Sequence, residues 1–192
     1  MSIYPIVKYG EPVLHKRAAA VTVFDQNLKR LIDDMFETLK ASRGVGLAAP
    51  QIGVDKQIFV YAAEDDTGVF RSGVFVNPTL AAPVFNPARP DPDTESEGCL
   101  SVPGLSYPLK RAPRATLTGF DQTGERITLN ASGWFARIMQ HEWDHLQGTL
   151  YVDRLQGKWA RHWKKDKSAE GLGVPGQSWL PGSDPDPFGH DD

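Results

Sequence analysis

Cysteine is almost absent from this sequence. Among its 192 residues only Cys99 carries a thiol, so no intramolecular disulfide can form. This scarcity excludes the disulfide-stabilised secreted domains and is typical of proteins from a reducing compartment. A lone cysteine is more often a small buried apolar residue than a metal ligand or a nucleophile, so its role depends on its surroundings.

The sequence also lacks long apolar runs and an excess of basic charge. No stretch reaches the roughly 18 apolar residues of a membrane span. Residues 1–17 do not have the layout of a signal peptide, because Pro5, Lys8 and Glu11 interrupt any apolar run. The formal net charge of -3 argues against a protein that binds nucleic acid over its whole surface. We therefore expect a cytoplasmic protein that has no membrane partner.

Apolar periodicity predicts two helices. One spans residues 25–40 and begins at Asp25 as N-cap, and the other spans residues 132–147 and stops at Gly148. Residues 43–53 contain three glycines and a proline, so we expect a loop whose backbone closely approaches another group. Strand-like patterns occupy residues 57–62, 73–76, 115–120 and 125–129, and the last two read as a hairpin.

Composition sets the expected domain limits. The proline-rich residues 83–92 are interpreted as a surface insertion. From residue 167 onward Gly, Pro, Ser and Asp predominate, which predicts a flexible C-terminal tail over residues 167–192 behind one domain of residues 1–166. Short strands separated by turns, together with two helices, indicate an α+β domain.

The second helix carries ionisable side chains on an apolar face. At 100° per residue this face holds Trp134, Ile138, His141, Glu142, His145 and Leu146, and the opposite, polar face holds Arg137, Gln140, Asp144 and Gln147. Unpaired ionisable groups on a buried stripe are costly, and a metal ion removes that cost. Histidines four residues apart can bind one ion, and the Glu142 between them can act as a base. The alternative is a pair of hydrogen-bonded core histidines with Glu142 in an ion pair.

A third ligand is needed, because catalytic zinc-type sites usually have three protein ligands and a water molecule. The segment Glu97-Gly98-Cys99-Leu100-Ser101 can supply it. Gly98 lets the backbone approach closely, and a metal would hold Cys99 as a thiolate.

At this point the sequence closely resembles the peptide deformylases. The likeness is carried in the expected order by residues 44–53 (GVGLAAPQIG), 97–101 (EGCLS) and 140–146 (QHEWDHL), and it extends from about residue 3 to about residue 165. The three motifs together are far more specific than the His-Glu-x-x-His pattern alone. The resemblance implies short antiparallel strands packed around a central metal-binding helix.

The resemblance also implies the activity. The family removes the formyl group from N-formylmethionine on newly synthesised polypeptides and releases formate. Its metal ligands correspond to Cys99, His141 and His145, and its catalytic carboxylate to Glu142. The usual ion is Fe²⁺, although Zn²⁺, Ni²⁺ or Co²⁺ can occupy the site. The Gln51 amide and the Leu100 N–H would stabilise the oxyanion of the reaction.

Substrate contacts are expected on both sides of this site. Gly46 and Gly98 would let the formylated peptide lie as an added strand. By resemblance, Val45, Ile138 and the stem of Arg137 would line the methionine pocket, although ordinary packing explains these residues equally well. The basic residue that some relatives have after the cysteine motif has no counterpart in residues 104–107.

Residues 154–167 form a basic segment that contains Trp159 and Trp163. The simpler interpretation is a helix with packed tryptophans and solvated lysines. The functional interpretation is docking on ribosomal RNA near the exit tunnel.

Two other functions use the same helix. A zinc endopeptidase would take its third ligand from a downstream His or Glu and would not need Cys99. A non-enzymatic ribosome-associated protein would hold a structural metal, but such a site has no use for a base at Glu142.

Overall fold

The computed structural model describes residues 2–84 and 89–189, so residues 85–88 of the expected insertion lie outside the described residues. The helices are α1 (Gln26–Ala41), α2 (Gly133–Leu146) and α3 (Gly157–Ala169), with 3-10 turns at Pro12–His15, Ala49–Ile52 and Tyr151–Arg154. The strands are β1 (Ile6–Val7), β2 (Gly46–Ala48), β3 (Ile58–Glu64), β4 (Phe70–Ala81), β5 (Ser96–Cys99), β6 (Val102–Pro108), β7 (Arg114–Phe120), β8 (Arg126–Ser132) and β9 (Ser178–Trp179). Within the described ranges, none of the helices has the length and apolar character needed to cross a bilayer.

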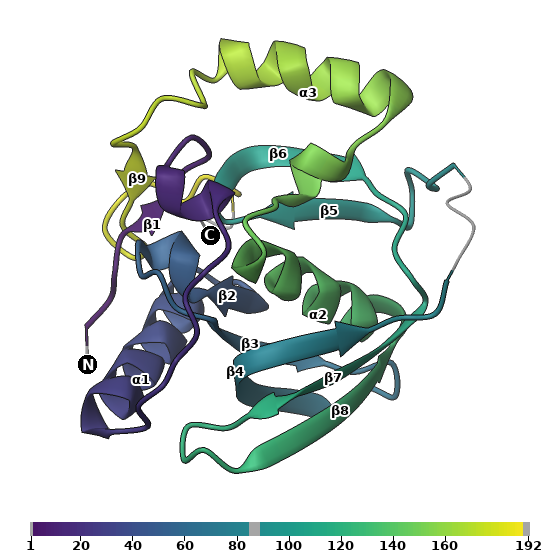
Figure 1. Ribbon diagram of the computed structural model, residues 1–192. Helices are drawn as coiled ribbons and strands as arrows, with labels where there is room; N and C mark the ends of the chain where they lie inside the picture. Colours follow the sequence, from purple (N-terminus) through teal and green to yellow (C-terminus); the bar gives the residue numbers. More distant parts are fainter. Residues whose placement is uncertain (1, 85–88, 190–192) are drawn as a thin grey trace.

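Helix α2 occupies the centre of the molecule, between two antiparallel sheets (Figure 1). One side of the helix faces a five-stranded sheet of order β2-β3-β4-β7-β8. The hairpin of β5 and β6 lies on the other side, and α3 lies beyond this hairpin at the edge of the molecule. The expected α+β architecture, with antiparallel strands around a central helix, is confirmed.

Helix α1 begins where its sequence predicts. The Asp25 side chain accepts hydrogen bonds from the backbone N–H groups of Asn27 (3.0 Å) and Leu28 (2.9 Å). These bonds satisfy donors that the first turn of a helix leaves unpaired. The apolar stripe of α1 then packs against Ile58 and Val60 of β3. Local capping and periodicity are therefore enough to define this helix.

Helix α2 is buried on more sides than its periodicity predicts. The supposedly polar face is covered, since Arg137, Gln140 and Asp144 are all buried, whereas Trp134 is 49% exposed. The polar groups on this face are paired inside the protein. The Gln140 side chain, for example, donates to the carbonyl of Ala112 (2.9 Å) and accepts from its N–H (3.2 Å). The assignment of a polar outer face to α2 is thus wrong, because ion pairs and hydrogen bonds replace water there.

Short strands form in the segment expected to be a loop and in the segment that holds Cys99. Within residues 43–53, β2 pairs with β3 at the edge of the large sheet, and the 3-10 turn Ala49–Ile52 follows it. Within residues 95–104, β5 pairs with β6. Strands this short and rich in glycine show no alternation that could predict them, so their pairing is decided by tertiary contacts.

The C-terminal residues are packed against the domain. Helix α3 continues to Ala169, across the expected boundary at residue 166, and β9 pairs with β1. Leu172 and Trp179 are buried, and Trp179 Nε1 donates to the backbone carbonyl of Leu100 at 3.0 Å. A few buried apolar side chains therefore hold this segment against the domain, although its composition is mostly polar.

Substituting Trp179→Ala should reduce the free energy of unfolding by about 3–5 kcal/mol, the usual cost of truncating a buried tryptophan. The matched control is Val174→Ala in the same segment, where the side chain is 59% exposed and the expected change is within about 0.5 kcal/mol. Urea denaturation measures both values. Equally small changes in the free energy of unfolding of the two variants would mean that the segment does not pack stably against the domain.

Candidate active site

The structure brings Cys99, His141 and His145 together. Their potential ligand atoms all lie within 4.8 Å of one another, and Cys99 Sγ is 3.2 Å from His145 Nε2. The two histidines lie one turn apart on α2, while Cys99 is the last residue of β5. The β5–β6 hairpin therefore places the thiol beside the helix, in a donor set that suits a divalent transition metal.

Glu97 orients the first histidine. Its Oε2 lies 3.0 Å from His141 Nδ1, which leaves Nε2 as the nitrogen available to a metal. Burial by itself would raise the pKa of Glu97, but hydrogen bonds and charge from Arg111, with a further hydrogen bond from His141, hold this pKa well below its usual range. Glu97 therefore remains a carboxylate that accepts a hydrogen bond from the His141 ring.

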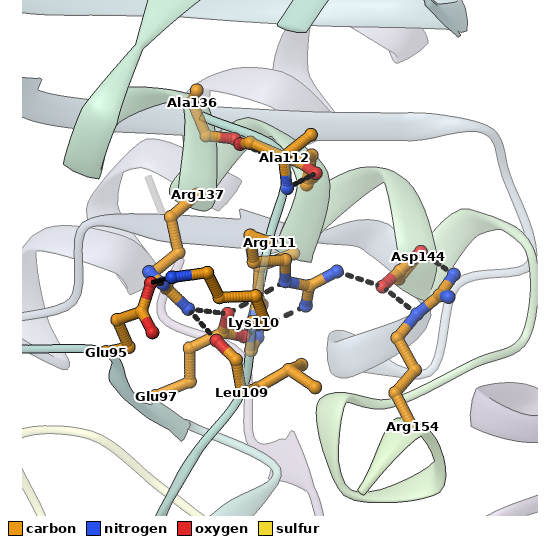
Figure 2. Close-up of polar contacts among 12 residues, drawn as sticks. Glu95, Glu97, Leu109, Lys110, Arg111, Ala112, Ala136, Arg137, Asp144 and Arg154 are labelled. Atoms are coloured by element: carbon orange, nitrogen blue, oxygen red, sulfur yellow. Dashed lines mark hydrogen bonds and ion pairs between the residues drawn. The ribbon is translucent and has the colours of Figure 1, made fainter. Parts of the chain in front are cut away.

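A buried ionic network surrounds this carboxylate (Figure 2). Arg111 donates to Glu97 through Nε (2.8 Å) and Nη2 (2.9 Å), and Arg137 donates to it through Nη1 (2.6 Å). Arg111 also reaches Asp144 (2.5 Å), to which Arg154 donates from the other side. Sequence reasoning missed this network, since no local spacing connects Arg111 with residues on α2.

The electrostatics of the histidine pair fit a cation. Burial opposes protonation of His141, yet the charge of Cys99 and hydrogen bonds to Cys99 and Glu97 raise its pKa well above the ordinary value. At His145, burial and the charge of His141 lower the pKa well below the ordinary value. The cluster thus favours positive charge at His141 and keeps the His145 imidazole neutral. A divalent ion satisfies both demands, because it replaces the proton and accepts both imidazole lone pairs.

Glu142 lies beside the candidate ligands, and one of its carboxylate oxygens is unpartnered within the part of the chain that the structure describes. It is buried, and its Oε2 has no hydrogen-bond partner among the described residues. Burial raises the pKa of Glu142 to about 7. A side chain at position 46 would overlap the Glu142 carboxylate, so Gly46 provides the space that this group occupies.

Gln51 is held with its amide directed toward the thiol. Its Oε1 accepts a hydrogen bond from the Ala48 N–H (2.8 Å), and its Nε2 lies 3.6 Å from Cys99 Sγ and 3.4 Å from Ser101 Oγ. The acceptor end of the amide is therefore occupied, while the donor end faces the site. Leu100 follows Cys99 in the turn between β5 and β6.

A cavity of about 230 Å³ adjoins these groups. His145 is not among the residues that line it. The other residues predicted for the site all contribute to the lining, namely Val45, Gly46, Gln51, Gly98, Cys99, Leu100, Arg137, Ile138, His141 and Glu142. Two further aromatic residues, Trp134 and Phe188, also line it. No sequence signal pointed to Phe188, because it lies in the segment that composition marked as a tail.

The basic segment 154–167 divides into inward and outward side chains. Arg154 is engaged by Asp144, and Trp163 is buried. Lys158 lies over the Trp159 ring, 4.3 Å from its centroid. Arg161, Lys164 and Lys165 are exposed on α3. Arg154 and Lys158 are exposed as well, so among the basic residues of this segment only Lys167 is half-buried.

Comparison with known proteins gives a consistent result. The family model described as polypeptide deformylase matches residues 3–160. The peptide deformylase of Mycolicibacterium paratuberculosis is 49% identical over 197 residues, covering 99% of this chain and 100% of the relative. Peptide deformylase 2 of Corynebacterium efficiens is 46% identical, with full coverage of both chains.

Solved structures agree with the sequence relatives. The peptide deformylase of Thermus thermophilus has a TM-score of 0.74 and 37% identity, covering 88% of this chain and 95% of that chain. The enzyme of Synechococcus elongatus, solved in complex with actinonin, has a TM-score of 0.75 and 31% identity, covering 87% and 85%. The chain belongs to the polypeptide deformylase family.

Proposed function

We propose that this chain removes the formyl group from N-formylmethionine at the start of newly synthesised polypeptides, and that the site around α2 performs this hydrolysis. Family membership supports the reaction. The observation that carries the assignment of the site is the convergence of Cys99, His141 and His145 beside the unpartnered carboxylate oxygen of Glu142.

Cys99, His141 and His145 would hold the metal. When bound, the cation would supply Lewis acidity, which lowers the pKa of water so that it can lose a proton near neutral pH, and which polarises the formyl group. A thiolate and two imidazoles suit several divalent transition metals. Among these we assign Fe²⁺ as the resident ion, on the basis of the family resemblance.

Glu142 would move the proton. Its free Oε2 takes a proton from the attacking water and delivers it to the amine nitrogen that leaves when the C–N bond breaks. One carboxyl group thus serves first as base and then as acid. Burial keeps competing water away from it, and Gly46 keeps its position clear.

Gln51 and Leu100 would stabilise the charge that develops on the formyl oxygen. The Gln51 amide is preorganised, because the Ala48 N–H fixes its other end. The backbone N–H of Leu100 is the second donor. One donor of this kind is typically worth about 10²–10³ in rate.

The peptide would bind as an added strand between β2 and β5. β2 is an edge strand of its sheet, and β5 pairs only with β6 among the described strands, so each has an edge that a peptide can use. A Cβ at Gly98 would have only the Leu105 carbonyl oxygen nearby, at 3.9 Å, which leaves room for a substrate. The methionine side chain would lie against Val45, Ile138 and the stem of Arg137.

Glu142→Gln should reduce kcat for formate release from N-formyl-Met-Ala-Ser by about 10²–10⁴, the usual contribution of a general acid–base group. Metal content should stay unchanged, because Glu142 is not a ligand in this proposal. Formate release and metal analysis on the same sample measure both quantities. A variant that retains its turnover would contradict the assigned role.

Cys99→Ala should lose both metal and formate release, whereas the wild-type protein prepared without oxygen should contain Fe²⁺ as its main metal. Elemental analysis of both proteins tests the ligand set and the identity of the ion. A zinc endopeptidase would keep its metal and its activity after this substitution. A variant that binds metal as fully as the wild type would therefore rule out Cys99 as a ligand.

We further propose that the protein works in the cytoplasm and docks on ribosomal RNA near the exit tunnel, where its substrates emerge. The support is the set of exposed cations on α3, which lies at the edge of the molecule, away from α1 (Figure 1). Cations of this kind bind RNA phosphates and release counterions.

Reversing Arg161, Lys164 and Lys165 to Glu should weaken binding to ribosomes in a sedimentation assay at low salt. The matched control reverses the exposed Lys29, Lys40 and Lys56, which changes the net charge by the same amount outside α3. Equal loss of ribosome binding in the two triple variants would mean that net charge causes the loss. That result, or unchanged binding in both variants, would contradict a docking surface on α3.

A further inference from the structure

The C-terminal segment contributes an aromatic side chain to the cavity that also contains the metal ligands. Phe188 lines this cavity together with Leu100 and Cys99. It reaches this position from the segment that follows β9, in which the structure assigns no helix or strand to the described residues. A ring placed there by so distant a part of the sequence is a candidate for substrate contact.

The position of Phe188 is fixed through Trp179. The two rings pack edge to face with centroids 6.1 Å apart, and Trp179 in turn donates its indole N–H to the Leu100 carbonyl at 3.0 Å. Trp179 is buried, and its strand pairs with β1. The Phe188 N–H also donates to Asp186 Oδ1 at 2.8 Å. The segment is therefore anchored directly against the turn that follows Cys99.

Phe188 and Leu100 form an apolar wall of the cavity. The residues of this wall come from other parts of the chain than those of the proposed methionine pocket. The methionine set of Val45, Ile138 and Arg137 comes from the β2 edge and α2. Leu100 comes from the β5–β6 turn, and its Cδ1 would be 3.0 Å from a Cβ at Gly44, so it closes the gap toward the start of β2. In the proposed binding mode, a peptide with its formyl group at the candidate metal ligands and its first side chain among the methionine set would extend toward this wall.

We infer that Phe188 is a specificity-determining residue, which contacts the side chains that follow the formylmethionine and favours apolar ones. This inference rests on the proposed function. An aromatic ring presents a large apolar surface and loses little conformational freedom on binding, so it discriminates between apolar and small side chains.

The test compares two substrates, N-formyl-Met-Leu-Phe and N-formyl-Met-Ala-Ser, in the full-length metal-loaded enzyme. In Phe188→Ala the ratio of their kcat/KM values, apolar over small, should fall by about ten-fold, the low end for loss of an apolar pocket contact. The loss should appear mainly in KM for the apolar peptide. Phe188→Leu, which keeps an apolar side chain, should retain most of the ratio. Val174→Ala, in the same segment and 59% exposed, should leave the ratio unchanged.

A merely structural role for Phe188 would lower activity on both peptides equally, with a lower urea midpoint or a lower metal content, and that result would overturn the inference. An unchanged ratio in an active Phe188→Ala enzyme would overturn it as well, and the proposed function would stand. If the wild-type enzyme released formate from neither peptide, the proposed function itself would fail and the inference with it.

Discussion

The buried carboxylate of Glu97 is the group on which the rest of the structure depends. It joins β5 to α2 through His141 and Arg137, and to the segment before β7 through Arg111. A buried charge that loses its partners costs several kcal/mol, so these parts of the chain can assemble in few other ways. Because Cys99 lies two residues beyond Glu97 on the same strand, the arrangement that satisfies the carboxylate also places the thiol beside His145.

The same network explains why α2 can lie at the centre of the molecule although half of its surface is polar. Arg111 lies between the carboxylates of Glu97 and Asp144, and Arg154 completes the pairing from the turn that leads to α3. Replacing such a network with apolar residues is often neutral or stabilising, so its presence is not explained by stability. Geometry explains it better, because rigid partners around His141 fix the ring that would bind the metal.

The cavity beside the candidate metal ligands is assembled from parts that are distant in sequence. Gly46 and Val45 come from the edge of the large sheet, Leu100 from the hairpin turn, Ile138 from α2 and Phe188 from the C-terminal segment. Helix α2 contributes both Ile138 and the histidines, so the candidate metal ligands and part of the cavity wall are held by the same element.

The sequence alone determined the features that are local. The Asp25 cap, the period of α1 and the one-turn spacing of His141 and His145 follow from helix geometry over a few residues, and the three motifs identified the family. Only the tertiary structure decided the Glu97–Arg111 pairing, the burial of the polar side of α2 and the position of Phe188. The physical reason is that these contacts join residues far apart in the chain. Their energies depend on which groups become desolvated together, and no local period or composition records that.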